Sequence, residues 1–61
     1  MQAPEIQSLF NEAVRLEKSG ERKKSKETYL KIIELSPDHH LSYQNLGAIF
    51  SKEGDHRNAL D

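Results

Sequence analysis

With 61 residues the chain has room for one small domain, and a domain of this size buries only about 60% of its unfolded surface. Nine Lys and Arg against ten Asp and Glu give a formal net charge of −1, which excludes a strongly basic nucleic-acid binder. There is no Cys, so disulfides and zinc–thiolate sites are excluded. No apolar run approaches the roughly 20 residues of a membrane span, and the first residues lack the features of a signal peptide. We therefore expect a cytoplasmic protein without a membrane contact.

The first predicted helix covers residues 5–19. Pro4 suits its first turn, because the amide hydrogen that proline lacks has no helical partner there. Gly20 is expected to end it. Its apolar residues recur every three or four positions, which is the spacing of one helix face: Ile6, Leu9, Phe10, Ala13, Val14 and Leu16.

Two further helices follow from the same periodicity. The second covers residues 22–35 and ends at Ser36-Pro37, because a residue before proline is disfavoured in helical backbone. The third covers residues 40–53 and ends at Gly54, with Asp55 as the N-cap of a fourth helix. The fold class we expect is all-α: antiparallel helix–turn–helix repeats, with three full helices plus the start of a fourth.

The sequence repeats with a period of 34 residues. Shifted by this amount, residues 1–27 align with residues 35–61, and the two turn glycines fall in register, each followed by an acidic residue. A helix–turn–helix period of this length is the signature of tetratricopeptide repeats. Four aligned pairs are identical: Ser8 with Ser42, Asn11 with Asn45, Lys18 with Lys52, and Gly20 with Gly54.

The third predicted helix resembles the tetratricopeptide repeat family most closely. Tyr43, Leu46, Gly47 and Phe50 reproduce the aromatic, leucine, glycine, aromatic series of that family, and the first 34 residues match it more loosely. Glu12 departs from the pattern, since it stands where the second repeat has leucine. The resemblance implies a lead-in over residues 1–5, a first repeat over 6–39 and a second repeat over 40–61 that is truncated in its second helix.

The sequence predicts which small and which large residues lie at the helix contacts. Small side chains are expected to let the helices approach closely: Ala13 and Ser25 in the first repeat, Gly47 and Ala59 in the second. Because Gly47 lies at such a contact, its replacement by Leu is expected to overpack the interface. Leu9, Leu16, Tyr29 and Ile32 are expected to fill the space between the first two helices, and Tyr43, Leu46 and Phe50 to pack the third helix onto the second.

Residues that could carry catalysis or hold a cofactor are nearly absent. Asp38-His39-His40 supplies metal-ligand types, but adjacent residues point in divergent directions, which favours a solvated turn. The glycines are isolated, so there is no phosphate-binding loop. We expect no enzyme activity, no metal and no cofactor.

Arg22-Lys23-Lys24-Ser25-Lys26 forms the one run of charge. It could contact an acidic partner or act as a nuclear-localisation signal, or it could be the solvated outer face of the second helix. The sequence leaves both interpretations open.

The resemblance also implies a peptide-binding surface. In tetratricopeptide proteins the first helix of each repeat lines a concave groove that holds an extended peptide, and Asn45 resembles the groove asparagine that grips a peptide backbone or a terminal carboxylate. Phe10 and Val14 replace the Lys and Asn that the carboxylate-clamping subfamily has at these places, which argues against such a clamp. For Phe10, local packing and ligand contact remain equal alternatives. The candidate peptide-binding residues are Gln7, Phe10, Asn11, Val14, Leu41, Gln44, Asn45, Ala48 and Lys52.

Three functions remain open at this point. The first is a non-enzymatic interaction module that binds a peptide or partner protein through this concave face. The second is a structural unit that forms homo-oligomers through an uncovered face of the third helix. The third is an N-terminal appendage of a larger enzyme.

Overall fold

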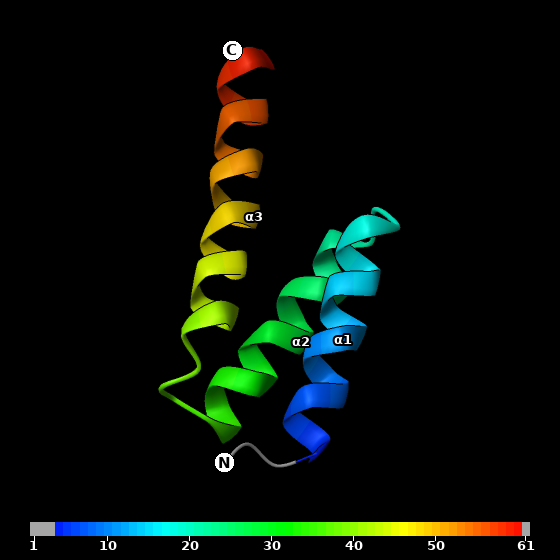
Figure 1. The fold of residues 1–61 in the computed structure, drawn as a ribbon. Helices are drawn as coiled ribbons and strands as arrows, with labels where there is room; N and C mark the ends of the chain where they lie inside the picture. The colour runs from blue at the N-terminus through cyan, green and yellow to red at the C-terminus, as the bar shows by residue number, and fades with distance from the viewer. Residues whose placement is uncertain (1–3, 61) are drawn as a thin grey trace.

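The computed structural model describes the backbone of residues 4–60 and the side chains of residues 5–54. It contains three α-helices: α1 (Pro4–Lys18), α2 (Arg22–Leu35) and α3 (His40–Leu60) (Figure 1). Residues 4–60 contain no strand, and none of these helices has the length and apolar character to cross a membrane. The predicted all-α fold is confirmed.

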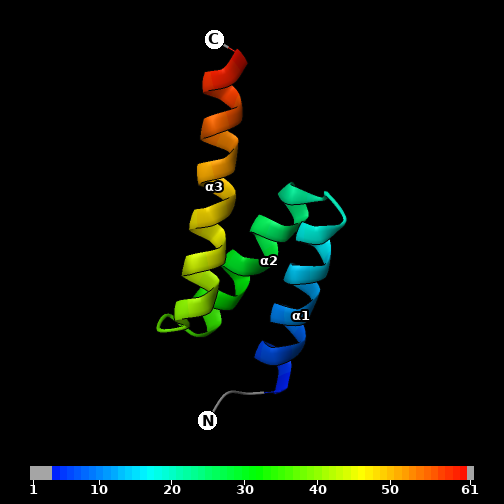
Figure 2. The ribbon, with the colours of Figure 1, turned by 45° about the horizontal axis from the view of Figure 1, so that its top comes forward.

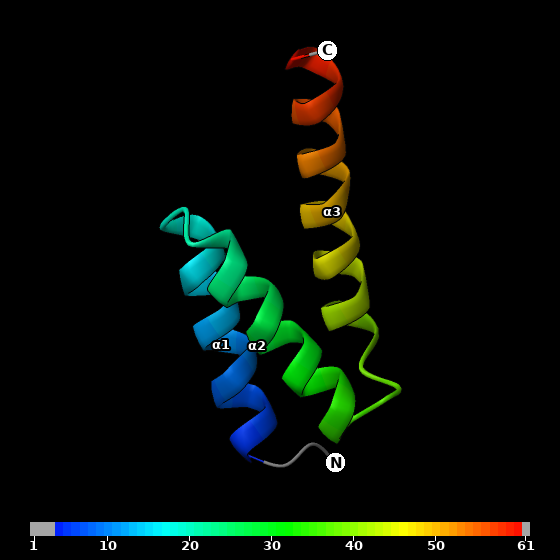
Figure 3. The same cartoon turned by 180° about the vertical axis from the view of Figure 1, so that it is seen from behind.

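The three helices lie side by side with α2 in the middle (Figure 2). Each helix runs antiparallel to the one before it, and the C-terminal turns of α3 extend past the turn that joins α1 to α2 (Figure 3). The molecule is therefore an elongated, flat layer, with principal extents of 44 × 22 × 13 Å.

The turn between α1 and α2 depends on Gly20, as predicted. Gly20 has φ 89°, a left-handed conformation that costs glycine little. Two backbone bonds close the end of α1: the amide of Glu21 donates to the carbonyl of Leu16 at 2.9 Å, and that of Gly20 donates to Glu17 at 3.2 Å. This pair is a Schellman motif, which satisfies carbonyls that the helix end leaves free.

The core lies where α2 packs between its two neighbours. Tyr29 and Ile32 are fully buried, Leu16 is buried and Leu9 is half-buried, as expected for the interface of α1 and α2. The hydroxyl of Ser25 donates to the carbonyl of Ala13 at 2.9 Å, so these small residues do bring α1 and α2 close. The equivalent contact of Ala59 lies outside the described side chains. From α3, Leu46 and Ile49 complete the core, and burying side chains of this size stabilises the fold by about 1.5–3 kcal/mol each.

The structure departs from expectation at Gly54. Helix α3 does not end there but continues to Leu60, so the expected start of a fourth helix is not found. The reason is the cost of helix nucleation: a new helix must fix several residues before its first hydrogen bond, whereas an existing helix extends by one bond per residue. Gly54 itself has no positive φ, so it does not form the left-handed cap that often ends a helix.

The outer face of α3 is also exposed where packing was expected. Leu46 packs on α2, but the side chains of Tyr43 and Phe50 are 48% and 52% exposed, and a Cβ added to Gly47 would meet no atom within 4 Å. These three residues each follow a buried residue by one position, which turns them about 100° away from the core. The expected overpacking by Leu at Gly47 is therefore wrong for this chain.

Candidate peptide-binding surface

The α1 residues of the predicted surface divide into an exposed pair and a packed pair. Gln7 and Asn11 are exposed, and the Gln7 amide nitrogen donates to the Asn11 side-chain oxygen at 3.2 Å. Phe10 and Val14 are half-buried against the core. The surface thus has an exposed rim of two amide side chains on α1, Gln7 and Asn11. Beside it lies an apolar base formed by Phe10 and Val14.

Phe10 packs against α2 and against the turn that precedes α3. Its ring lies edge-on to Tyr29, with centroids 6.0 Å apart, and tilted against His39, with centroids 5.4 Å apart. Of the two alternatives for Phe10, local packing is what the structure contains, with Tyr29 and His39 as its partners. These two ring contacts hold Phe10 in place at the base of the surface.

A chain of hydrogen bonds joins all three helices under the surface. The Asn45 amide nitrogen donates to the Tyr29 hydroxyl at 3.1 Å, and that hydroxyl donates to the Glu17 carboxylate at 3.0 Å. Burial raises the pKa of Tyr29, the bond from Asn45 lowers it, and Glu17 raises it further. Asn45 therefore has a structural contact, and its second amide hydrogen and its carbonyl oxygen still have capacity for a ligand.

The other α3 residues of the predicted surface are open to solvent. Leu41 is 55% exposed, and Gln44, Ala48 and Lys52 are exposed as well. Together with Asn45 they form the side of α3 that is rotated away from Tyr43 and Phe50.

Two models of the tetratricopeptide repeat match the sequence, one over residues 6–39 and the other over residues 28–61. The chain belongs to the tetratricopeptide repeat family. No curated protein and no solved structure gives a significant match. Tetratricopeptide repeats are protein–protein interaction modules and are typically non-catalytic.

The first match covers α1 from residue 6 and all of α2, and the second covers α2 from residue 28 together with α3. The 34-residue period aligns the candidate residues of α1 with candidate residues of α3. Asn11 and Asn45 are one such pair, but only Asn45 bonds to the core, because Tyr29 lies beside it.

The sequence did not predict the burial of His39 or its role at the start of α3. Its side chain is buried and not solvated, and its Nδ1 accepts the backbone N–H of Ser42 at 3.2 Å and lies 2.8 Å from the Ser42 hydroxyl. It is the N-cap of α3 in this tetratricopeptide fold. Since Nδ1 accepts that N–H, the neutral ring carries its proton on Nε2. An N-cap side chain accepts from an amide two or three residues later, so a polar residue just before the expected start of the helix at residue 40 is the signal that would have indicated the cap.

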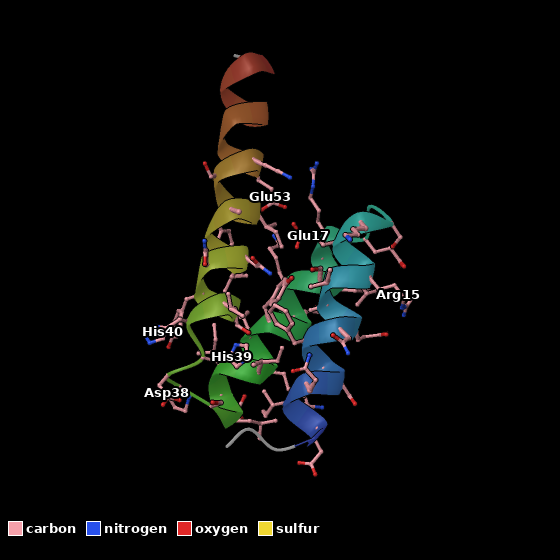
Figure 4. All side chains as sticks on the ribbon, in the orientation of Figure 1. Arg15, Glu17, Asp38, His39, His40 and Glu53 are labelled. Atoms are coloured by element: carbon pink, nitrogen blue, oxygen red, sulfur yellow. The ribbon has the colours of Figure 1, made fainter. Side chains whose placement is uncertain are left out.

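The neighbours of His39 do not join it in a metal site. Asp38 and His40 point away from the helices, whereas His39 points inward (Figure 4). No group of three His, Cys, Asp or Glu residues is placed to hold a metal ion among the described residues.

The basic run is partly engaged within the molecule. Lys26 bridges α2 and α3: its Nζ lies 2.9 and 3.1 Å from the Glu53 carboxylate oxygens and 5.3 Å from the Phe50 ring centroid. Lys24 pairs with Glu21 at 3.3 Å on the surface. Lys26 therefore links α2 to α3, while Arg22 and Lys23 are exposed.

Proposed function

We propose that this chain binds an extended internal segment of a partner protein across the surface formed by α1 and α3. The observation that carries the proposal is Asn45, which is held in place by Tyr29 and retains hydrogen-bonding capacity. A peptide backbone presents the donors and acceptors that such an amide pairs with. A fixed amide also loses less side-chain entropy on binding than a mobile one.

Apolar contacts beside that amide supply the rest of the binding energy. Leu41 is exposed on α3, and Phe10 and Val14 lie half-buried on α1. An extended peptide places alternate side chains on opposite sides, so its backbone can pair with Asn45 while every second side chain covers apolar surface.

The probe we suggest is a peptide selected from a random decapeptide library on the immobilised chain. Leu41→Ser is expected to raise the dissociation constant of that peptide at least tenfold. Leu30→Ser is the matched control, because Leu30 is 52% exposed and Leu41 is 55% exposed, but Leu30 lies on α2. Equal effects of the two variants would contradict the proposed surface.

A second measurement separates an internal segment from a chain terminus. Because α1 carries Phe10 and Val14 where carboxylate clamps carry Lys and Asn, amidation of the peptide's C-terminus is expected to leave the affinity unchanged. A tenfold loss on amidation would show that a terminal carboxylate is the ligand.

A second candidate function is self-association. The half-exposed rings of Tyr43 and Phe50 favour it, because burying large apolar side chains is the main driving force of protein association. We expect sedimentation equilibrium to give an average mass that rises above that of the monomer as the protein concentration increases.

A further inference from the structure

A carboxylate continues the candidate peptide-binding surface along α1. Phe10, Val14 and Glu17 follow one another at spacings of four and three residues, so they lie on one face of the helix. Glu17 is half-buried, and Figure 4 shows its side chain in the space between α1 and α3. It was not among the candidate peptide-binding residues, but it extends their surface towards the turn between α1 and α2.

The Tyr29 hydroxyl holds this carboxylate in place. It donates to Oε1 of Glu17 at 3.0 Å and accepts from the Asn45 amide at 3.1 Å. A single hydroxyl group therefore separates Glu17 from the amide that makes the proposed contact with a peptide backbone. A long side chain that leaves this backbone beside Asn45 begins within reach of Glu17.

Among the described side chains, no cation pairs with Glu17. No Lys, Arg or His nitrogen of this set lies within 4 Å of its carboxylate. Lys26 is held by Glu53 at 2.9 Å instead, and Lys18 and Lys52 are exposed. A carboxylate has about four acceptor sites, so the bond from the tyrosine leaves most of its capacity free. Because burial of an unpaired charge is unfavourable, a half-buried carboxylate attracts a cation more strongly than one in open solvent.

We propose that Glu17 selects a Lys or Arg side chain in the peptide that this surface binds. The inference rests on the peptide-binding function proposed above and specifies its ligand, which is an extended segment with a basic residue beside its apolar ones. The basic group donates a charge-assisted hydrogen bond to the carboxylate. Because Tyr29 already fixes Glu17, little side-chain entropy of Glu17 is lost on binding. An acidic residue at the same position of the peptide is repelled.

The test separates the charge of Glu17 from its hydrogen bond. Glu17→Gln removes the charge but keeps a side-chain oxygen that can accept from Tyr29, so a purely structural role would survive the change. Glu27→Gln is the matched control, because it changes the net charge equally at an exposed position of α2. Decapeptides are selected from a random library on the immobilised original chain and on each variant, and are sequenced. Circular dichroism checks that both variants remain helical.

Peptides selected on the original chain and on Glu27→Gln are expected to be enriched in Lys or Arg at one position, and those selected on Glu17→Gln are not. Replacing that basic residue of a selected peptide by Met is expected to raise the dissociation constant about tenfold for the original chain and less than twofold for Glu17→Gln. An equal loss in both proteins would overturn the inference. So would the absence of basic enrichment on the original chain, or its disappearance on Glu27→Gln, which would reflect net charge alone.

Failure of this inference is distinguishable from failure of the proposed function. Peptides that Leu41→Ser weakens and Leu30→Ser does not weaken bind the proposed surface, whether or not they carry a basic residue. If such peptides show no dependence on Glu17, the peptide-binding function stands and the selection of a basic residue is wrong. If the two leucine variants have equal effects, or if no peptide is selected, the proposed function is wrong and the role of Glu17 is overturned with it.

Discussion

The two hydrogen bonds of the Tyr29 hydroxyl offer the most direct test of how the three helices are held together. The hydroxyl donates to Glu17 of α1 at 3.0 Å and accepts from Asn45 of α3 at 3.1 Å. Tyr29→Phe removes both bonds but keeps the ring and its contact with Phe10. A hydrogen bond to a charged group contributes about 1.5–3 kcal/mol and a neutral one about 0.5–1.5 kcal/mol. Because Glu17 and Asn45 are only partly buried and can bond to water, we expect a net loss of about 1–2 kcal/mol.

That loss is large for a protein of this size. A stability of about 0.05–0.15 kcal/mol per residue gives about 3–9 kcal/mol for the whole chain, and each kcal/mol moves the melting temperature by about 4–8 °C. The assay is thermal and urea unfolding followed by circular dichroism at a concentration where the chain is monomeric. Tyr43→Phe is the control, because it removes the same atom from a half-exposed ring.

The reasoning fails if Tyr29→Phe unfolds at the same urea concentration as the original chain, or no earlier than Tyr43→Phe. A double-mutant cycle between Tyr29→Phe and Asn45→Ala adds a second criterion. Since the two side chains are in contact, the two losses should not add, and additive losses would show that the bond contributes nothing.

Three further results are expected. Gly20→Ala should cost about 1–2 kcal/mol, since φ 89° is strained for a residue with a Cβ, and an unchanged urea midpoint would contradict the role of this turn. Gly54→Ala should stabilise the monomer by up to about 1 kcal/mol, because the added methyl group meets no atom within 4 Å and helical glycine is unfavourable; a lower melting temperature in dilute solution would oppose this. Stability should fall at alkaline pH: the pKa of Tyr29 is raised in the folded state, so its contribution is complete below the unfolded value of about 10 and is lost as the pH rises through the folded value. Urea midpoints between pH 8 and pH 11 should therefore decline less in Tyr29→Phe than in the original chain.

The sequence predicted the first hairpin well because its signals are local. Periodic apolar residues placed α1 and α2, and Gly20 and Pro37 marked their ends through backbone restrictions that act within one or two residues. Ser25 and Ala13 were recognised as a close contact because small residues at a helix interface have one simple packing reason, and the structure joins them by a hydrogen bond.

The wrong predictions concern α3, because the exposure of its side chains depends on which segments pack against it. Repeat patterns describe the faces used in a long array, so Tyr43, Gly47 and Phe50 were expected to be packed, whereas the described chain leaves them exposed. Gly54 was expected to end the helix, but a glycine ends a helix only when the chain that follows has a better alternative. His39 was missed for another reason: hydropathy counts it as polar, and its burial depends on one cap and one aromatic contact.

The central position of α2 also decides how this chain folds. The bonds between helices join residues only 12, 16 and 27 positions apart, and each of them has one partner on α2. Contacts this local close small loops at low entropic cost, so folding is expected within microseconds to milliseconds. Because neither α1 nor α3 can find its partners before α2 has formed, substitutions in α2 should slow folding. Substitutions in the outer helices should chiefly accelerate unfolding, since each of these helices can detach while the other stays packed.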